Sequence, residues 1–304
     1  MRSHLIAHIK INRVQNSFMA HQLYRLLALF LISLLLFASC IKETPIPSYV
    51  RVEKSLLESY EPVSGSSSHQ IVDVWLYVDN QQIGVFETPV NIPILKEGPV
   101  SLRLKAGVMA NGIADSRRVY EFYLPYEQEV NLVRDSVIVV TPVYAYRENT
   151  SFSWIEGFED LRVNMERTKN SDTTLFITSN PEEVYEGNAS GKVVLSAPDS
   201  VSYFEVVSDT TYRLPQDGSI VVLEFDYKTE SVFTVGLTAF DQVWRRTPVL
   251  NLNPTDDWKK VYVYLTTAVT THINAEYYKV FIGGVLDEEE EQSVILLDNI
   301  KLLY

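Results

Sequence analysis

Apolar and polar residues alternate along much of the chain between residues 71 and 106. In Ile71–Val78 every even-numbered residue is aliphatic, so these side chains would share one face of a strand. Val100–Ala106 alternates in the same way, with polar residues at the odd positions. Two further strands are expected at Glu121–Tyr126 and Val137–Tyr144, whose prolines favour sheet edges or strand ends. The pattern predicts a small β-sandwich over residues 71–148.

Short strand candidates recur beyond residue 150. The candidate strands are Leu175–Thr178, Lys192–Leu195, Tyr203–Val207, Ile220–Lys228, Val232–Leu237, Val261–Leu265, Tyr277–Ile282 and Val294–Leu303. No amphipathic helix of about 10–15 residues separates them, which counts against a parallel α/β sheet. Short strands divided by turn residues favour a two-sheet sandwich or jelly roll over residues 149–304.

Both domains carry family resemblances that agree with an all-β fold. The first contains YVDNQQIG…TPVNIPILKEGPVSLRLKAG, which resembles PEGA-type and related small immunoglobulin-like β modules. The second is similar to the galactose-binding-like jelly roll of many carbohydrate-binding modules. Five segments carry that similarity, in the expected order and spacing: GFED, GNASGKVVL, VVLEFDYKTE, DDWKKVYVYL and ILLDNIKLLY. The resemblances imply an immunoglobulin-like sandwich followed by a jelly roll, a fold that also serves as a purely structural module.

A short apolar run near the N-terminus predicts export. Leu26–Phe37 follows Arg25, and two small residues separate it from Cys40, the chain's single cysteine. Twelve helical residues rise about 18 Å, too little for a bilayer core of about 30 Å. Residues 1–39 are therefore expected to be a removable signal. The order Phe-Ala-Ser-Cys resembles a lipobox, although Phe37 stands where Leu is usual. It implies a lipid anchor on Cys40, the alternative being a chance cysteine after an ordinary signal peptide.

The residues after the cysteine favour a tether. Residues 40–70 contain three prolines and a Ser-Gly-Ser-Ser-Ser tract, which predicts a flexible linker. Lys42-Glu43 resembles the export signal of surface lipoproteins in Bacteroidota-type bacteria, which implies an outer-membrane protein facing the cell exterior. Met19 is an alternative start. Four tripeptides resemble O-glycosylation acceptors of that bacterial group; they begin at Asp135, Asp172, Asp199 and Asp209.

Charge and histidine content exclude several functions. Loss of residues 1–39 would remove four basic residues and no acidic one, so the net charge would fall from −13 to −17. That balance argues against nucleic acid and anionic membrane surfaces as partners. His69 and His272 are the only histidines beyond the signal, and neither belongs to a catalytic motif. The sequence therefore favours a protein that is not an enzyme.

The best candidate for a binding site lies at Phe240–Arg246. Sugar C–H faces stack on flat aromatic rings, while sugar hydroxyls need planar polar partners. The expected ligand-binding residues are Trp244, Arg245, Arg246 and Gln242, with Tyr185 and Tyr203 on the same face. The competing interpretation makes Trp244 a core or edge aromatic.

The jelly-roll resemblance also implies a structural calcium. Carboxylates near the start of the domain and on its last strand would hold the ion, namely Glu159 or Asp160 together with Asp298. The alternative is that Asp298-Asn299 makes turn or edge hydrogen bonds. No other cofactor is expected.

Two hypotheses about function follow. The first is a surface binding module with a glycan as ligand, and the second is a structural or assembly subunit of a cell-envelope or fimbria-like complex. A face lined by aromatic residues and ringed by polar groups would favour the first. A large exposed apolar patch would favour the second.

Overall fold

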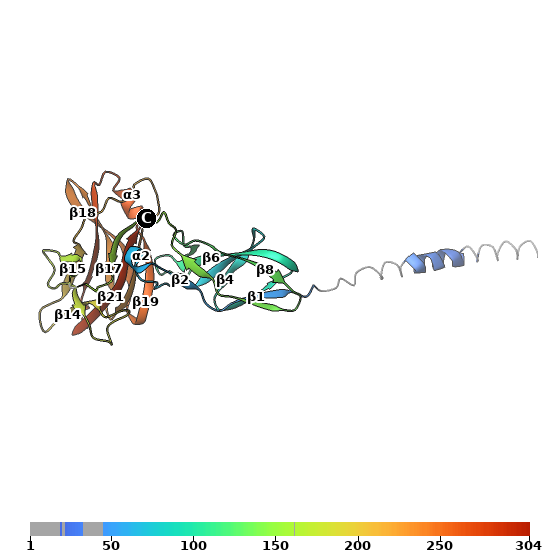
Figure 1. Cartoon of the computed structure of the whole chain (residues 1–304), viewed down its shortest axis with the longest axis horizontal. Coiled ribbons are helices and arrows are strands. Elements are labelled where there is room, and N and C mark those ends of the chain that lie inside the picture. The colour runs from blue at the N-terminus through green and yellow to red at the C-terminus, as the bar shows by residue number, and fades with distance from the viewer. Residues whose placement is uncertain (1–18, 20–21, 33–44, 161) are drawn as a thin grey trace, which may run out of the picture. The chain divides into compact units, whose positions relative to one another are not determined.

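The computed structural model describes residues 19, 22–32, 45–160 and 162–304. The chain divides into two compact units, Met1–Ile46 and Pro47–Tyr304. In the first unit residues 22–32 form a helix (Figure 1), and no helix in the described part of the chain is long and apolar enough to cross a membrane. The predicted cleavage site and Cys40 lie outside the described residues, so the signal and the lipid anchor stay predictions.

The second unit begins with a small sandwich (Figure 1). Its elements are β1 (Ser48–Val52), β2 (Leu56–Glu58), α2 (Glu61–Ser64), β3 (Asp73–Val78), β4 (Gln81–Glu87), β5 (Val90–Ile94), β6 (Gly98–Met109), β7 (Arg117–Val119), β8 (Tyr126–Leu132), β9 (Val137–Val140) and β10 (Val143–Ala145). One sheet has the order β5-β1-β9. The other has the order β4-β3-β6-β7, with β8 also paired to β6, and β2 pairs with β10. Val74, Leu76, Leu102 and Leu104 are fully buried, so the predicted inward face is confirmed.

The prediction of a flexible tether is wrong from Ser48 onward. Ser48–Val52 forms β1, which pairs with β5 on one side and β9 on the other, and Val50 and Val52 are fully buried. Its alternation lasts only five residues and stands between prolines and serines, so the composition hid it. The serine-rich segment that follows lies on the second sandwich, where Ser68 Oγ donates to Asp226 at 2.8 Å.

Two further strand predictions need correction. Glu121–Tyr126 is a turn that enters β8 only at its last residue, and its aromatic residues pack at the end of the sandwich. Val137–Tyr144 is two strands, β9 and β10, interrupted at Thr141-Pro142 because proline cannot donate a ladder hydrogen bond.

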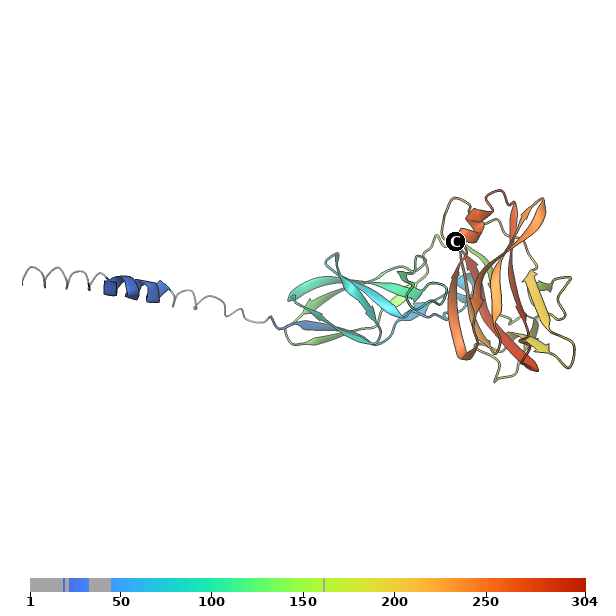
Figure 2. The same ribbon diagram turned by 180° about the vertical axis from the view of Figure 1, so that it is seen from behind.

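The second sandwich contains β11–β21 and a short helix. The elements are β11 (Phe152–Glu156), β12 (Met165–Arg167), β13 (Phe176–Thr178), β14 (Ser190–Ser196), β15 (Tyr203–Ser208), β16 (Val222–Thr229), β17 (Phe233–Asp241), β18 (Val243–Leu252), β19 (Thr255–Tyr264), α3 (Thr266–Thr271), β20 (Tyr277–Val285) and β21 (Gln292–Leu303). One sheet has the order β13-β14-β21-β16-β19, with β11 also on β21, and the other has the order β12-β15-β20-β17-β18. Figure 2 shows both sheets from behind.

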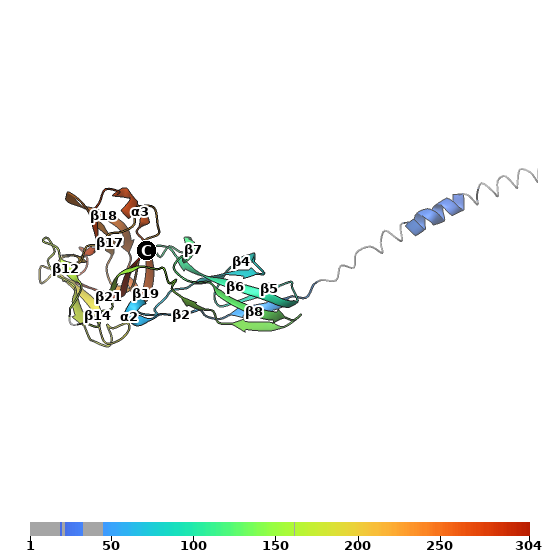
Figure 3. The same cartoon turned by 45° about the horizontal axis from the view of Figure 1, so that its top comes forward.

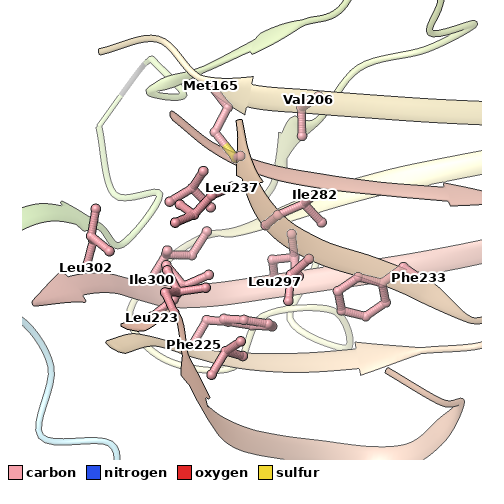
Figure 4. Packing of buried hydrophobic residues seen from close by; sticks show 14 of the residues in the cluster. Met165, Val206, Leu223, Phe225, Phe233, Leu237, Ile282, Leu297, Ile300 and Leu302 are labelled. Atoms are coloured by element: carbon pink, nitrogen blue, oxygen red, sulfur yellow. The ribbon is translucent and has the colours of Figure 1, made fainter. Parts of the chain in front are cut away.

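A single apolar core fills the space between these two sheets (Figure 4). Phe225 of β16 and Leu297 of β21 lie on one side, and Phe233, Leu237 and Ile282 lie on the other. All are fully buried. The all-β jelly-roll sandwich predicted from the sequence is confirmed.

The two sandwiches share a third apolar cluster. Tyr120 and Tyr123 of the first pack with Tyr262, Val222 and Leu303 of the second, and Tyr120 and Tyr262 rings lie 4.8 Å apart. The turn after β6 also joins the edge of β19 (Figure 3). A cluster this apolar fixes the two sandwiches as one body.

A buried polar network lies beside that cluster. The Glu224 carboxylate, fully buried, accepts hydrogen bonds from the hydroxyls of Tyr120 and Tyr146. Lys260 Nζ lies 3.8 Å from Glu224 and 3.4 Å from Asp226. Buried charges persist only when they are paired and hydrogen-bonded, so these groups depend on one another.

Lys301 belongs to the same network and carries an altered pKa. Its Nζ donates to the Ser66 carbonyl at 2.6 Å and to the Tyr146 hydroxyl at 3.1 Å. Burial lowers the pKa of Lys301 to about 8, and the nearby Lys260 charge acts in the same direction, against the carboxylate of Glu224. The charged form is therefore less favoured in the folded chain than in the unfolded chain.

This pKa predicts a pH-dependent stability that Lys301→Met removes. Between about pH 8 and the unfolded value of 10.5 the unfolded state binds more protons, so the free energy of unfolding rises with pH. Across that window the free energy of unfolding of wild type should rise by up to about 3 kcal/mol relative to that of the variant. Urea denaturation of both proteins at about pH 7 and about pH 10 measures it. Lys169→Met, at an exposed position, is the control. If the difference in unfolding free energy between wild type and K301M is the same at both pH values, the lowered pKa of Lys301 is wrong.

Candidate functional site

The outward face of the sheet β12-β15-β20-β17-β18 carries a row of aromatic residues. Phe240 of β17 is in register with Trp244 of β18 on one side and with Tyr277 of β20 on the other. Directly paired residues point to the same face of a sheet, so the three rings are neighbours. Phe240 and Trp244 ring centroids are 5.1 Å apart, and Trp244 is 49% exposed. The row lies on the outward face of the sheet, with the Phe240 and Trp244 ring planes at 52° to one another.

Polar groups surround the row. The Arg213 guanidinium lies 5.2 Å from the centre of the Tyr277 ring and donates to its hydroxyl at 3.3 Å. Gln242 forms the turn between β17 and β18 with a left-handed φ of 59°. Arg245 pairs with Ala239, so it belongs to the opposite face of the hairpin from Trp244. Arg213 is therefore the planar donor that the structure places against the rings.

Arg246 extends the same face toward its centre. Its Nε donates to Glu205 at 2.7 Å, and the guanidinium lies 3.9 Å from the centroid of the buried Phe281 ring. Phe281 can lie over β17 because Gly236 has no side chain. A Cβ there would come within 2.7 Å of the ring and 2.3 Å of the Thr247 carbonyl oxygen. The result is a fixed layer of ring, guanidinium and carboxylate beside the exposed aromatic row.

The structure separates the two tyrosines that were expected to share this face. Tyr203 lies on it beside Glu205, but opposite Val285, at the far end of β20 from Tyr277. Tyr185 lies elsewhere: its ring packs 5.1 Å from Trp258, and its hydroxyl is 3.3 Å from Ser68 Oγ. Neither tyrosine joins the aromatic row.

The carboxylates expected to bind calcium accept hydrogen bonds from a loop. Glu159 accepts hydrogen bonds from the backbone N–H groups of Asn188 and Ala189, at 2.8 and 3.1 Å. Asp298 accepts from Ser190 Oγ at 2.6 Å and from the Asn299 N–H at 2.8 Å. The hydrogen bond between Asn299 and Asp298 is of the kind that the alternative interpretation expects.

The surroundings of these carboxylates add a second observation. Burial raises the pKa of Asp298 to about 7, so a divalent ion would have to displace a proton. Asp160 is exposed. In the part of the chain that the structure describes, no three His, Cys, Asp or Glu side chains gather as a metal site would require. Calcium stays a prediction.

Sequence analysis missed Tyr277, Phe281 and Arg213. The alternation of Tyr277, Lys279 and Phe281 was a usable signal, because it places all three on one face of β20. What the sequence did not reveal is that β20 pairs with β17, so that Tyr277 meets Phe240. Lys279 on the same face makes an ion pair with Glu166 of β12.

Comparison with known proteins yields structural likeness alone. No family model matches the chain, and no curated protein matches it. The solved structures similar to it include TmCBM61 in complex with β-1,4-galactotriose, with 14% identity, a TM-score of 0.29, and coverage of 45% of this chain and 85% of that one.

Two other similar structures have comparably low sequence identities and TM-scores. The D114A mutant of the family 29 carbohydrate-binding module CBM29-2 has 9% identity and a TM-score of 0.34, over 51% of this chain and 86% of that one. A family 11 module from Clostridium thermocellum, in complex with a β-1,3-1,4-mixed-linked tetrasaccharide, has 13% identity and a TM-score of 0.33, over 50% and 94%. The ligands are those of the other proteins, and the sheets described above define the fold of this one.

Proposed function

We propose that this chain is a non-enzymatic binding module whose ligand is a glycan. The observation that carries the proposal is the row of Trp244, Phe240 and Tyr277 across three strands, exposed at Trp244 and flanked by Arg213. An exposed aromatic ring accepts the C–H face of a pyranose, and guanidinium and amide groups donate to its hydroxyls. Arg246 lies on the same face two residues along β18 from Trp244 and is held by Glu205 at 2.7 Å, so it is a positioned donor, which lowers the entropic cost of binding.

The test is a glycan array followed by calorimetric titration with wild-type chain and Trp244→Ala. Loss of one stacking ring should weaken binding about tenfold or more, equivalent to about 1.4 kcal/mol. Tyr60→Ala is the matched control, because Tyr60 is 69% exposed and lies outside the row. Adding a chelator tests the calcium prediction separately. Equal affinities for wild type and W244A would remove the row from the binding site.

The second candidate function is assembly with other envelope proteins. It is favoured by β9, which ends the sheet β5-β1-β9 and exposes Val139 to 59% and Val137 to 49%. An edge strand with exposed aliphatic residues can receive a further strand from a partner. A folded chain that binds no glycan would favour this function over the first.

The proposed location is the outer membrane, facing the cell exterior, through lipid on Cys40. The support is the apolar run and the lipobox resemblance described above. Cys40→Ser should abolish incorporation of an alkyne-labelled fatty acid in growing cells and move the protein out of the membrane fraction. Thr44→Ser, which lies outside the lipobox and keeps the cysteine, is the control. Labelling that persists in C40S would refute lipidation of Cys40.

A further inference from the structure

A cleft lies where the two sandwiches meet, away from the aromatic row. Its volume is about 600 Å³, and residues of both sandwiches line it. The first sandwich contributes the turn after β6, at Asn111–Ile113, and the second contributes the β18–β19 turn and Trp258. The cleft lies at the edge strand β19 and at the end of β18 that contains Asn251, whereas Trp244 lies near the start of β18, seven residues earlier. The two places are therefore separate sites.

The groups that line this cleft fit an uncharged polar ligand. Trp258 lines it and is backed by the Tyr185 ring at 5.1 Å. Four carboxamides line it as well: Gln70, Asn111, Asn251 and Asn253. The charges of Asp257 and Lys259 cancel in the net charge of the lining. The other lysine of the lining, Lys260, is paired with the buried carboxylates of Glu224 and Asp226. An aromatic ring surrounded by amides, without net charge, is suited to sugar hydroxyls and not to an ion.

The walls of the cleft are fixed before a ligand arrives. The Asn111 side-chain oxygen accepts from the Tyr264 N–H at 2.9 Å, and the Asn111 N–H donates to the Tyr262 carbonyl at 2.9 Å. On the other wall Asn251 Oδ1 accepts from Thr234 Oγ1 at 2.8 Å. With both side-chain oxygens engaged, each amide presents its NH₂ group as a donor. Fixed donors reduce the entropy that binding must overcome.

We infer that this cleft is a second binding site for a neutral saccharide, a few sugar units long. The volume falls within the range of about 300–1,000 Å³ typical of small-ligand sites. The inference rests on the proposed function for its ligand class, but it uses different residues. Because both sandwiches contribute, the site exists only in a chain that contains both.

Native mass spectrometry of the full chain in detergent tests the inference. The probes are the neutral oligosaccharides found by the array, or cellotetraose and galactotriose if the array finds none. Wild type should bind two saccharides per chain. Trp244→Ala and Asn253→Ala should each bind one, at sites distinguished by hydrogen exchange at Asn111–Ile113. Trp258→Ala is the second cleft variant, and Tyr60→Ala is the control for both sites.

The outcomes separate the two proposals. A single saccharide lost in W244A and retained in N253A and W258A would overturn the cleft and keep the glycan-binding face. A single saccharide lost in N253A and W258A and retained in W244A would keep the cleft and overturn the aromatic row. Wild type that binds none of the probes would overturn both.

Discussion

Glu224→Leu is expected to lower the free energy of unfolding by about 3–5 kcal/mol, because removing one partner of a buried charge network leaves the others uncompensated. The substitution removes the carboxylate that lies 3.8 Å from Lys260 Nζ and leaves Asp226, at 3.4 Å, to balance the buried Lys260 charge. It also removes the acceptor of two buried tyrosine hydroxyls, Tyr120 and Tyr146. Urea denaturation of the full chain, followed by tyrosine and tryptophan fluorescence, measures the change.

Glu127→Gln is the matched control for that experiment. Glu127 also pairs with a basic residue, at 2.6 Å from Arg103, but its side chain is 54% exposed. Surface pairs of this kind contribute about 0–1 kcal/mol. Glu224→Gln, which keeps an acceptor for the tyrosines, should fall between the two. If E224L costs no more than E127Q, the network does not stabilise the junction between the sandwiches.

The sequence predicted the layers of this protein better than its boundaries. Alternation in Val100–Ala106 located a strand because the strand buries one face, and this pattern is visible in the sequence whatever strand it pairs with. The prediction of a tether failed because the strand at its start shows little local pattern. Ser48–Val52 is short and stands among prolines, and its burial depends on β5 and β9, which lie far along the chain.

The candidate site shows the same limit at the level of single residues. Trp244 could be chosen from its neighbours, because an aromatic beside Arg, Gln and Asp in a turn is visible locally. Its partners Phe240 and Tyr277 meet it only through the pairing of three strands, and Tyr185 does not meet it at all. The same holds for Lys301, which follows an apolar run and becomes a buried charge only because Ser66 and Tyr146 cover it. Long-range pairing of this kind leaves no local pattern.

Phe281→Ala is expected to cost about 3–5 kcal/mol of unfolding free energy, although Phe281 points to the outward face of its sheet. Its side chain is fully buried there, pressed over Gly236 on one side and covered by the Arg246 guanidinium at 3.9 Å on the other. Truncation therefore opens a cavity and removes the surface on which Arg246 rests. Chemical denaturation measures the cost, and calorimetry with the array's best glycan measures the effect on the aromatic row.

Phe176→Ala is the control, because it removes the same ring from a position that is 42% exposed in the same domain. Surface substitutions of this kind usually change stability by no more than about 0.5 kcal/mol. Equal costs for the two variants would show that Phe281 is not packed as the structure has it. A stable F281A chain that binds glycan as wild type does would show instead that the aromatic row works without the layer beside it. We expect F281A to lose much of its stability and also to bind glycan more weakly at temperatures where it is still folded. That result would show that the packing of Phe281 supports glycan binding on this face.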